Sequence, residues 1–238
     1  MSKIGIIAAM SSEARLFAGQ RIKNAHITQV QNHLIYVSGM GDEKAEVATR
    51  KLIEQGAIAL ISWGTAGSLS PSATPGDLLL PETVITPDTT YRPDQSWRER
   101  LEKHLIDHQQ PLNSAAILSG SGMVDHQKEK AELFQQTHCV AVDMESAAIA
   151  RVASEFGIPF IVVRAVVDAH DQAIPDLATN AINAFGEVRA VQLSKGLISQ
   201  PASLRDLIKL GRHFELASKT LKNVIQLCPE SLCFPATE

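Results

Sequence analysis

The stretch AVDMESAAIARVASEFGIPFIVVRAVVDAHDQ, residues 141–172, contains the pattern that decides the fold. Its middle part, from Glu145 to Phe156, is rich in alanine and predicts a helix, which Gly157 ends as a C-cap. The apolar run that follows, residues 158–168, lacks the alternation of a half-exposed strand and is typical of a strand buried on both faces. A strand, a helix and a second strand in succession predict a sheet that helices cover.

Strand-like and helix-like segments alternate along the first 200 residues. We therefore predict an α/β fold with a single domain, in which helices cover both faces of a central mixed β-sheet in three layers. Three local predictions accompany this fold. Ser11 or Ser12 caps the first helix, residues 86–98 form a long loop, and residues 179–199 form one helix.

The tail of the chain, residues 201–238, differs in character from the domain at 1–200 and predicts a C-terminal helical extension. Apolar residues recur at helical spacing over 203–225, opposite a face rich in lysine and arginine. Two alternatives follow from this pattern. The helix docks on the domain and leaves its basic face in water, or it contacts a membrane surface or another anionic partner.

The composition narrows the class of protein. The chain has 238 residues, 45% hydrophobic, with a formal net charge of −4, so no basic excess indicates nucleic acid as a partner. Its 3 cysteines are too few for a disulfide framework, and neither a metal-ligand spacing nor a cofactor motif occurs. The first apolar run, in MSKIGIIAAM, is too short to cross a membrane, so we expect a cytoplasmic protein that uses no metal and no cofactor.

Polar residues and glycines gather where the predicted strands end, and ligands of open α/β sheets bind beyond those ends. The candidates there are Glu13, Gly41, Thr65, Met123, Val124, Asp143, Glu145 and Asp168. Each also has a simpler explanation, because turns need glycine and acids are favourable at helix N-termini. We expect one cleft to collect them, with Gly41 and Asp143 among the groups that bind substrate.

Arg164 is different, because it interrupts a buried apolar run and needs an acidic partner or an anionic ligand. Several carboxylates near one buried arginine suit a reaction with a cationic transition state and a hydroxyl-rich substrate. Cleavage of a glycosidic bond through an oxocarbenium-like state is the natural candidate. One carboxylate would bind sugar hydroxyls, one would protonate the leaving group, and one would orient water.

Several motifs, in this order and spacing, resemble the nucleoside phosphorylase superfamily over about residues 3–195. They are IGIIAAMSSEA, SGMG, SWGTAGSLSP, SGSGMV and the block AVDMESAAIARVASEFGIPFIVVRAVVD. The early Glu13 makes the chain more similar to the nucleosidases for methylthioadenosine and S-adenosylhomocysteine. The resemblance implies an N-ribosyl hydrolase or nucleoside phosphorylase that acts on purine nucleosides. It also implies a homo-oligomer, in which residues 86–98 close the site of a neighbouring subunit.

The same resemblance implies roles for the site residues. Asp168 would protonate N7 of a purine and make the base a better leaving group. Glu145 would bind the ribose hydroxyls and stabilise the developing cation, while Met144 would pack against the sugar. Glu13, with Arg164 near it, would position the attacking water.

Thr65 is implied to line the place where phosphorylases hold phosphate, and Met123 and Val124 to form part of the base pocket. The chain departs from the nucleosidase pattern at three positions. Val167 stands where serine precedes the base-binding acid, Met123 replaces an aromatic residue, and Asp143 replaces glutamate. These departures favour a substrate other than methylthioadenosine, and they leave Asp143 either to shape its turn or to bind backbone amides.

The attacking group also follows from the resemblance. Hexameric phosphorylases carry a phosphate-binding arginine at the position of Ser62, and a carboxylate at Glu13 would repel phosphate, so hydrolysis is favoured. Phosphorolysis with phosphate as co-substrate is the alternative, and a non-catalytic nucleoside-binding protein is a remote one. The tail resembles the C-terminal extension of hopanoid-associated phosphorylase-like proteins, which implies adenosylhopane as the substrate from which adenine is released.

Overall fold

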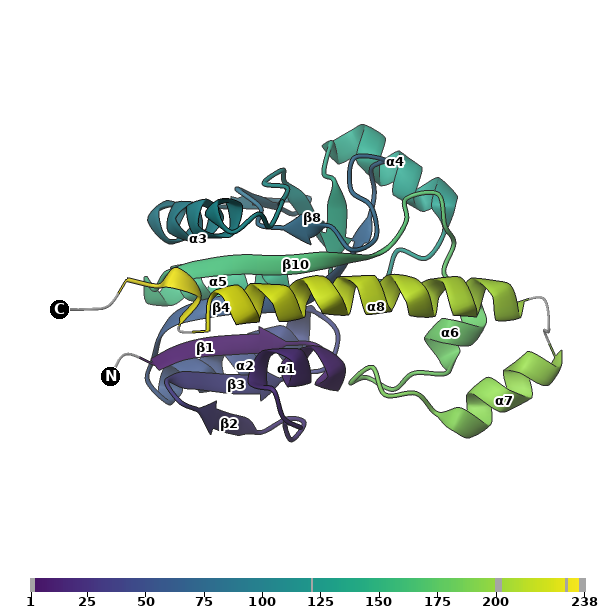
Figure 1. Cartoon of the computed structure of the whole chain (residues 1–238), viewed down its shortest axis with the longest axis horizontal. Helices are drawn as coiled ribbons and strands as arrows, with labels where there is room; N and C mark the ends of the chain where they lie inside the picture. Colours follow the sequence, from purple (N-terminus) through teal and green to yellow (C-terminus); the bar gives the residue numbers. More distant parts are fainter. Residues whose placement is uncertain (1–2, 121, 200–202, 230, 236–238) are drawn as a thin grey trace.

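Strand β4 (Ala57–Ser68) runs through the centre of the sheet and has neighbours on both sides (Figure 1). It pairs in parallel with β1 (Lys3–Ala8) and with β10 (Phe160–Asp168), and its last two residues pair antiparallel with β9 (Ala141–Asp143). The computed structural model describes residues 3–120, 122–199, 203–229 and 231–235.

The other strands are shorter. They are β2 (Ile27–Val30), β3 (His33–Val37), β5 (Leu78–Leu79), β6 (Val84–Ile85), β7 (Thr90–Tyr91) and β8 (Ile117–Ser119). Within these described residues, the sheet has ten strands in the order β2-β3-β1-β4-β9-β8-β6-β7, with β10 paired to both β4 and β5. Parallel and antiparallel pairs both occur, so the sheet is mixed, as predicted.

The helices follow the strands in alternation. They are α1 (Ser11–Ala18), α2 (Asp42–Glu54), α3 (Gln95–Asp107), α4 (Gln127–Thr137), α5 (Ser146–Phe156), α6 (Asp176–Asn180), α7 (Ala190–Ser199) and α8 (Leu204–Leu227), with a short 3-10 turn, η2 (Ser231–Cys233), near the end of the chain.

Successive residues of the central strands point to opposite faces of the sheet, and both sets are buried. Ile6 and Trp63 belong to the core on the side of α1 and α8, while Ile7 and Leu60 belong to the core on the side of α2 and α5 (Figure 1). The absence of period-two alternation in the sequence is explained, because both faces of these strands are largely buried. The predicted three-layer α/β fold is confirmed.

The unit β9–α5–β10 forms as the sequence predicts. Gly157 ends α5 in the left-handed conformation, with φ 64°, and its N–H donates to the carbonyl oxygen of Ala153. The small side chains of Ala147, Ala148 and Ala150 are buried where the helix lies on the sheet. Strands β9 and β10 run in opposite directions along β4, but both end beside Gly67, so Asp143 and Asp168 lie in the same part of the sheet.

The prediction of a long loop at 86–98 is wrong in part, because residues 90–91 form a strand and a helix begins at Gln95. Strand β7 pairs with β6, and α3 begins at Gln95, where the Asp94 carboxylate accepts the N–H of Trp97 at 2.8 Å. Trp97, Leu101 and Leu105 are fully buried at helical spacing. The signals were therefore present in the sequence, as an N-cap residue followed by an apolar stripe.

The prediction of one helix over residues 179–199 is also wrong, because α6 ends at Asn180 and α7 begins at Ala190. Between them, the side-chain oxygen of Asn183 accepts the backbone N–H groups of Phe185 and Glu187, at 2.9 and 3.0 Å. Gly186 adopts a positive φ of 72° in the same turn. Asparagine bonds of this kind compete with helix formation, and they break the segment into two helices.

Helix α8 packs along β10 and beside α1 (Figure 1). It buries Ala217, Leu221 and Val224 against the core that contains Trp63, while its lysines and arginines stay exposed. The predicted boundary between the domain and the extension, at 200/201, lies outside the described residues. Among the helices that the structure describes, none combines the length and the apolar character needed to cross a bilayer.

Candidate active site

A cavity of about 560 Å³ opens at the carboxyl ends of β1, β4, β9 and β10. Nine of the predicted site residues line it, namely Glu13, Thr65, Met123, Val124, Asp143, Met144, Glu145, Arg164 and Asp168. Gly41, the tenth, is not among the lining residues and contacts the site through Glu145. The structure thus brings together residues that are spread over more than 150 positions of the sequence.

Glu13 lies in the first turn of α1 and is 1% exposed. Its Oε1 accepts the backbone N–H and the hydroxyl of Thr65, both at 2.8 Å, and its Oε2 accepts the N–H of Met10 at 3.0 Å. Met10 is the N-cap, so the prediction of a cap at Ser11 or Ser12 is wrong, because Glu13 itself reaches back to the helix start. Burial raises the pKa of Glu13, and Arg164 and these hydrogen bonds oppose that rise.

Gly64 makes the close approach of Glu13 and Arg164 feasible. A Cβ atom at Gly64 would lie 2.7 Å from Glu13 Cδ and 2.8 Å from Arg164 Nη1, and the residue has a φ of 155°. Any larger side chain would therefore displace both charged groups. Gly64 and Thr65 lie inside β4 rather than after it, because β10 continues to pair with them through Arg164 and Ala165.

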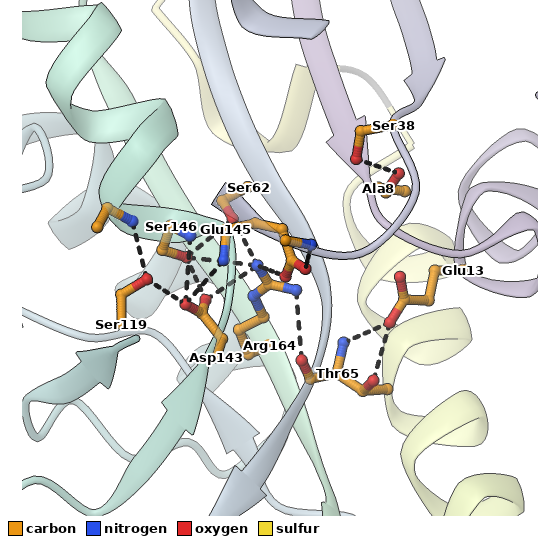
Figure 2. A network of polar contacts seen from close by, with 12 residues as sticks. Ala8, Glu13, Ser38, Ser62, Thr65, Ser119, Asp143, Glu145, Ser146 and Arg164 are labelled. Atoms are coloured by element: carbon orange, nitrogen blue, oxygen red, sulfur yellow. Dashed lines mark hydrogen bonds and ion pairs between the residues drawn. The ribbon is translucent and has the colours of Figure 1, made fainter. Parts of the chain in front are cut away.

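The buried Arg164 has the acidic partners that its position in the sequence requires. It is 1% exposed, and its Nη2 lies 2.9 Å from Asp143 Oδ2 and 3.3 Å from Glu145 Oε2 (Figure 2). The same nitrogen donates to the hydroxyl of Ser62 at 2.9 Å. The side chain at position 62 therefore belongs to the network that holds Arg164.

Asp143 turns into the protein and holds this network together. Its carboxylate accepts the hydroxyl of Ser119 at 2.7 Å and the backbone N–H of Ser146 at 3.2 Å, and it also accepts the Ser146 hydroxyl (Figure 2). The two alternatives coincide, since Asp143 shapes its turn by accepting backbone N–H groups of Glu145 and Ser146, and it also faces Arg164. A negative charge at this helix N-terminus is also favourable.

Glu145 faces the cavity between Arg164 and the turn after β3. Its Oε1 accepts the N–H of Gly41 at 3.0 Å, and Gly41 adopts a φ of 107° that favours glycine. Burial and the neighbouring Asp143 raise the pKa of Glu145 to about 7, against the opposing effect of Arg164.

Asp168 has a partner that the sequence analysis missed. Lys130 of α4 is 0% exposed, and its ammonium forms an ion pair with Asp168 Oδ2. Burial raises the pKa of Asp168, and Lys130 acts in the opposite direction. The sequence does contain a signal that Lys130 is buried. Lys130 lies three residues before Leu133 and four before Phe134, so it shares the side of α4 on which these partly buried residues lie.

The half of the cavity away from these charges is apolar. Helices α6, α7 and α8 and the segments between them supply Ile174, Ala178, Ala181, Ile182, Val188, Leu193, Leu207, Leu210 and Phe214. The cavity thus has a charged end on the sheet and an apolar end under the C-terminal helices.

Residues 3–199 match the family model of the phosphorylase superfamily. The chain belongs to the phosphorylase superfamily. A 5′-methylthioadenosine/S-adenosylhomocysteine nucleosidase of Staphylococcus epidermidis is 30% identical over 196 residues, 69% of this chain and 86% of that protein. One of Buchnera aphidicola is 26% identical over 200 residues, 71% of this chain and 79% of that protein. This superfamily member is therefore an N-ribosyl hydrolase or a nucleoside phosphorylase.

Solved structures of the superfamily have the same fold. The Neisseria meningitidis nucleosidase bound to methylthio-immucillin-A matches with a TM-score of 0.70 and 18% identity, over 95% of this chain and 98% of that one. Futalosine hydrolase of Helicobacter pylori matches with a TM-score of 0.69 and 19% identity, over 94% and 97% of the two chains.

We expect Asp143→Asn to lower the free energy of unfolding by about 3 kcal/mol, because it removes a buried charge that faces Arg164. Unfolding in urea at pH 7 measures the change. Asp107→Asn is the matched control, since Asp107 pairs with Lys103 on the exposed side of α3 and should contribute no measurable stability. Equal stability of wild type and Asp143→Asn would contradict the role assigned to Asp143.

Proposed function

We propose that the enzyme hydrolyses the N-glycosidic bond of purine nucleosides and releases adenine, with adenosylhopane as the favoured substrate. One observation carries the proposal: a single cavity joins the charged cluster at Glu13, Glu145, Arg164 and Asp168 to an apolar end under α6, α7 and α8. A nucleoside fits the charged end by its chemistry, and a large apolar group at the ribose 5′ position fits the other.

The proposed reaction uses three carboxyl groups. The Asp168 carboxyl proton passes to N7 of the purine while the bond from C1′ to N9 breaks and N9 keeps the electron pair. Glu145 accepts hydrogen bonds from the ribose hydroxyls and stabilises the cationic sugar. The oxygen of a water molecule bonds to C1′, and its proton passes to Glu13. Proton exchange with solvent then restores Asp168 and Glu13.

Two features favour water over phosphate as the attacking group. Arg164 is the one basic side chain among the described residues that line the cavity, and Asp143, Glu145 and Ser62 already engage it. Glu13 occupies the hydrogen-bond donors of Thr65 and would repel a phosphate anion. Phosphorolysis of the same bond is the alternative.

The apolar end of the cavity supports a bulky 5′ substituent. The relatives include nucleosidases for 5′-methylthioadenosine and S-adenosylhomocysteine, which supports an adenosine substituted at the 5′ position as the substrate class. Leu207, Leu210 and Phe214 of α8 lie in a helix that the superfamily match, residues 3–199, does not include. Activity on methylthioadenosine or S-adenosylhomocysteine themselves is the alternative.

We also propose a cytoplasmic location with contact to an anionic membrane, which the outer face of α8 supports. Leu204 and Ile208 are about half exposed beside Arg205, Lys209 and Arg212. An amphipathic helix of this kind buries its apolar residues among lipid headgroups, while its cations attract anionic lipids. A lipid-borne nucleoside could then enter the apolar end of the cavity from the membrane surface.

We expect Asp168→Asn to lower adenine release by at least about 100-fold, since the amide has no proton to give to N7. The assay measures adenine from methylthioadenosine, adenosine, inosine (as hypoxanthine) and adenosylhopane, each with and without phosphate. Wild-type rates that do not depend on phosphate support hydrolysis. A strict requirement for phosphate would instead establish phosphorolysis, and near-normal turnover by Asp168→Asn would reject the proposed acid.

We expect Leu210→Asp to lower kcat/KM for 5′-octylthioadenosine about 30-fold and for 5′-methylthioadenosine by less than about 3-fold, because a carboxylate would meet only the longer chain. Leu204→Asp, on the exposed side of the same helix, is the matched control and should leave both values unchanged. Equal losses on the two substrates would show that the apolar end does not hold the 5′ group.

We expect the triple variant Arg205→Glu, Lys209→Glu, Arg212→Glu to lose binding to vesicles that contain phosphatidylglycerol. Each cation near such a surface contributes about 1 kcal/mol, so the partition coefficient should fall more than about 100-fold. Co-sedimentation with vesicles measures the bound fraction.

A second triple variant, Lys23→Glu, Lys103→Glu, Lys128→Glu, has the same net charge but alters exposed lysines elsewhere. It should still bind the vesicles. The same loss in both variants would indicate a net-charge effect rather than a membrane-binding face on α8.

A further inference from the structure

Lys130 is the buried cation that the proposed reaction leaves without a role. Its Nζ forms the ion pair with Asp168 Oδ2 and also donates to the carbonyl oxygens of Ala169 and Gln172, both at 3.0 Å. An ammonium has three N–H donors, and these three acceptors use all of them. The side chain is therefore fixed in one position.

Holding the turn after β10 does not by itself explain a buried charge. A neutral donor or a water molecule would satisfy the carbonyl oxygens of Ala169 and Gln172 without the desolvation cost of an ammonium, which amounts to several kcal/mol. Replacing buried ion pairs with apolar residues is often neutral or stabilising. The positive charge of Lys130 is therefore explained by the carboxylate it faces, which borders the cavity.

The pairing also fixes which oxygen of Asp168 is available. The whole carboxyl group lies over Gly67, where an added Cβ atom would approach Oδ1 to 3.1 Å and Oδ2 to 3.4 Å, and Lys130 occupies Oδ2. Among the described residues, no hydrogen bond to Oδ1 occurs. One carboxyl oxygen is therefore anchored, and the other is left for a ligand.

Lys130 also connects the acid to the segment proposed to hold the base. Met123 and Val124 line the cavity just before α4, the helix that carries Lys130. The carbonyl oxygen of Asp125 accepts the N–H of Ile174 at 2.8 Å, which ties the same segment to the turn after β10. The segment proposed to hold the base is thus connected to the turn that follows Asp168, both through Lys130 and through this hydrogen bond.

We propose that Lys130 is the positioning residue of the general acid: its ammonium anchors Oδ2 of Asp168 so that Oδ1 faces N7 of the bound purine. The inference rests on the proposed function. Lys130 does not touch the substrate and acts through Asp168.

The charge of Lys130 also acts on the protonation of Asp168. Among the described residues, Lys130 is the charged group of α4 that faces Asp168. The residue of β4 that faces Asp168 is the uncharged Gly67. On β10, the charge of Arg164 is paired with Asp143 and Glu145. Loss of the ammonium leaves burial unopposed and raises the pKa of Asp168 further. Because the acid works in its protonated form, the alkaline limb of the pH–rate profile should then move to higher pH.

The test measures kcat/KM for adenine release from pH 5 to 10 in the wild type, Lys130→Met and Lys130→Gln, with Lys128→Met as control. Lys128 lies on the same helix, and its side chain is 89% exposed. A second substrate, 4-nitrophenyl riboside, has a leaving group that needs no proton. Thermal unfolding of each variant accompanies the rates.

We expect Lys130→Met to lower kcat/KM for adenine release about 100-fold in the plateau, as misplacement of a catalytic group by about 1 Å does. Its alkaline limb should move to higher pH, while cleavage of the nitrophenyl riboside changes less than about 3-fold. Lys128→Met should match the wild type in the pH profile of adenine release, in cleavage of the nitrophenyl riboside and in thermal unfolding.

Equal losses on both substrates, or an alkaline limb that does not move, would overturn the proposal and leave Lys130 a structural residue. If Lys130→Met does not fold, Lys130→Gln decides by the same measurements, since its amide keeps a donor but not the charge. A wild type that releases no purine would reject the proposed function instead, and that outcome is separate from any effect of Lys130.

Discussion

The buried charge of Arg164 is the constraint on which the rest of the site depends. A guanidinium in the middle of a sheet costs several kcal/mol unless acids pair with it, and Asp143 and Glu145 approach it from the end of β9. Glu13 approaches from α1 across Gly64. Arg164 thus contacts groups from three places: it lies in the paired strand β10, it faces Asp143 at the start of α5, and it lies near Glu13 at the start of α1.

The same cluster is short of positive charge. Three carboxyl groups surround one arginine, and burial together with mutual repulsion raises the pKa of Glu145, while burial raises that of Glu13. A cationic sugar would supply the missing charge at the moment it forms, which is the condition for stabilising a transition state more than a ground state. In the proposed reaction, the oxocarbenium-like state offsets the part of this crowding that Arg164 does not.

The base side of the site is organised separately. Asp168 has its own cation, Lys130, which is not shared with the Arg164 cluster. Between the two clusters, the pairing of β10 with β4 shifts register between Val166 and Asp168. In the proposed reaction, Asp168 acts as the acid with its own cation, while Glu13 and Glu145 share Arg164.

Sequence patterns predicted the elements whose signals are local. The alanine-rich helix at α5 and its C-cap Gly157 were predicted because periodicity and a left-handed glycine act within one or two turns. Equally local signals limit the two predictions that differ from the structure: the Asp94 cap begins α3 inside the loop predicted at 86–98, and the Asn183 turn interrupts the helix predicted at 179–199. That Arg164 needs acidic partners was also predicted, because burial of its strand follows from the surrounding apolar residues.

The sequence by itself thus determined the alternation of strands and helices, and with it the edge of the sheet where the candidate residues meet. Only the tertiary structure decided that Asp143 holds Arg164, that Lys130 holds Asp168 across 38 residues, and that α6, α7 and α8 close an apolar end over the cavity. The physical reason is that the two kinds of feature depend on interactions over different distances along the chain. Helix and strand periodicity depends on neighbours a few residues apart, whereas an ion pair or a cavity wall depends on where distant elements pack.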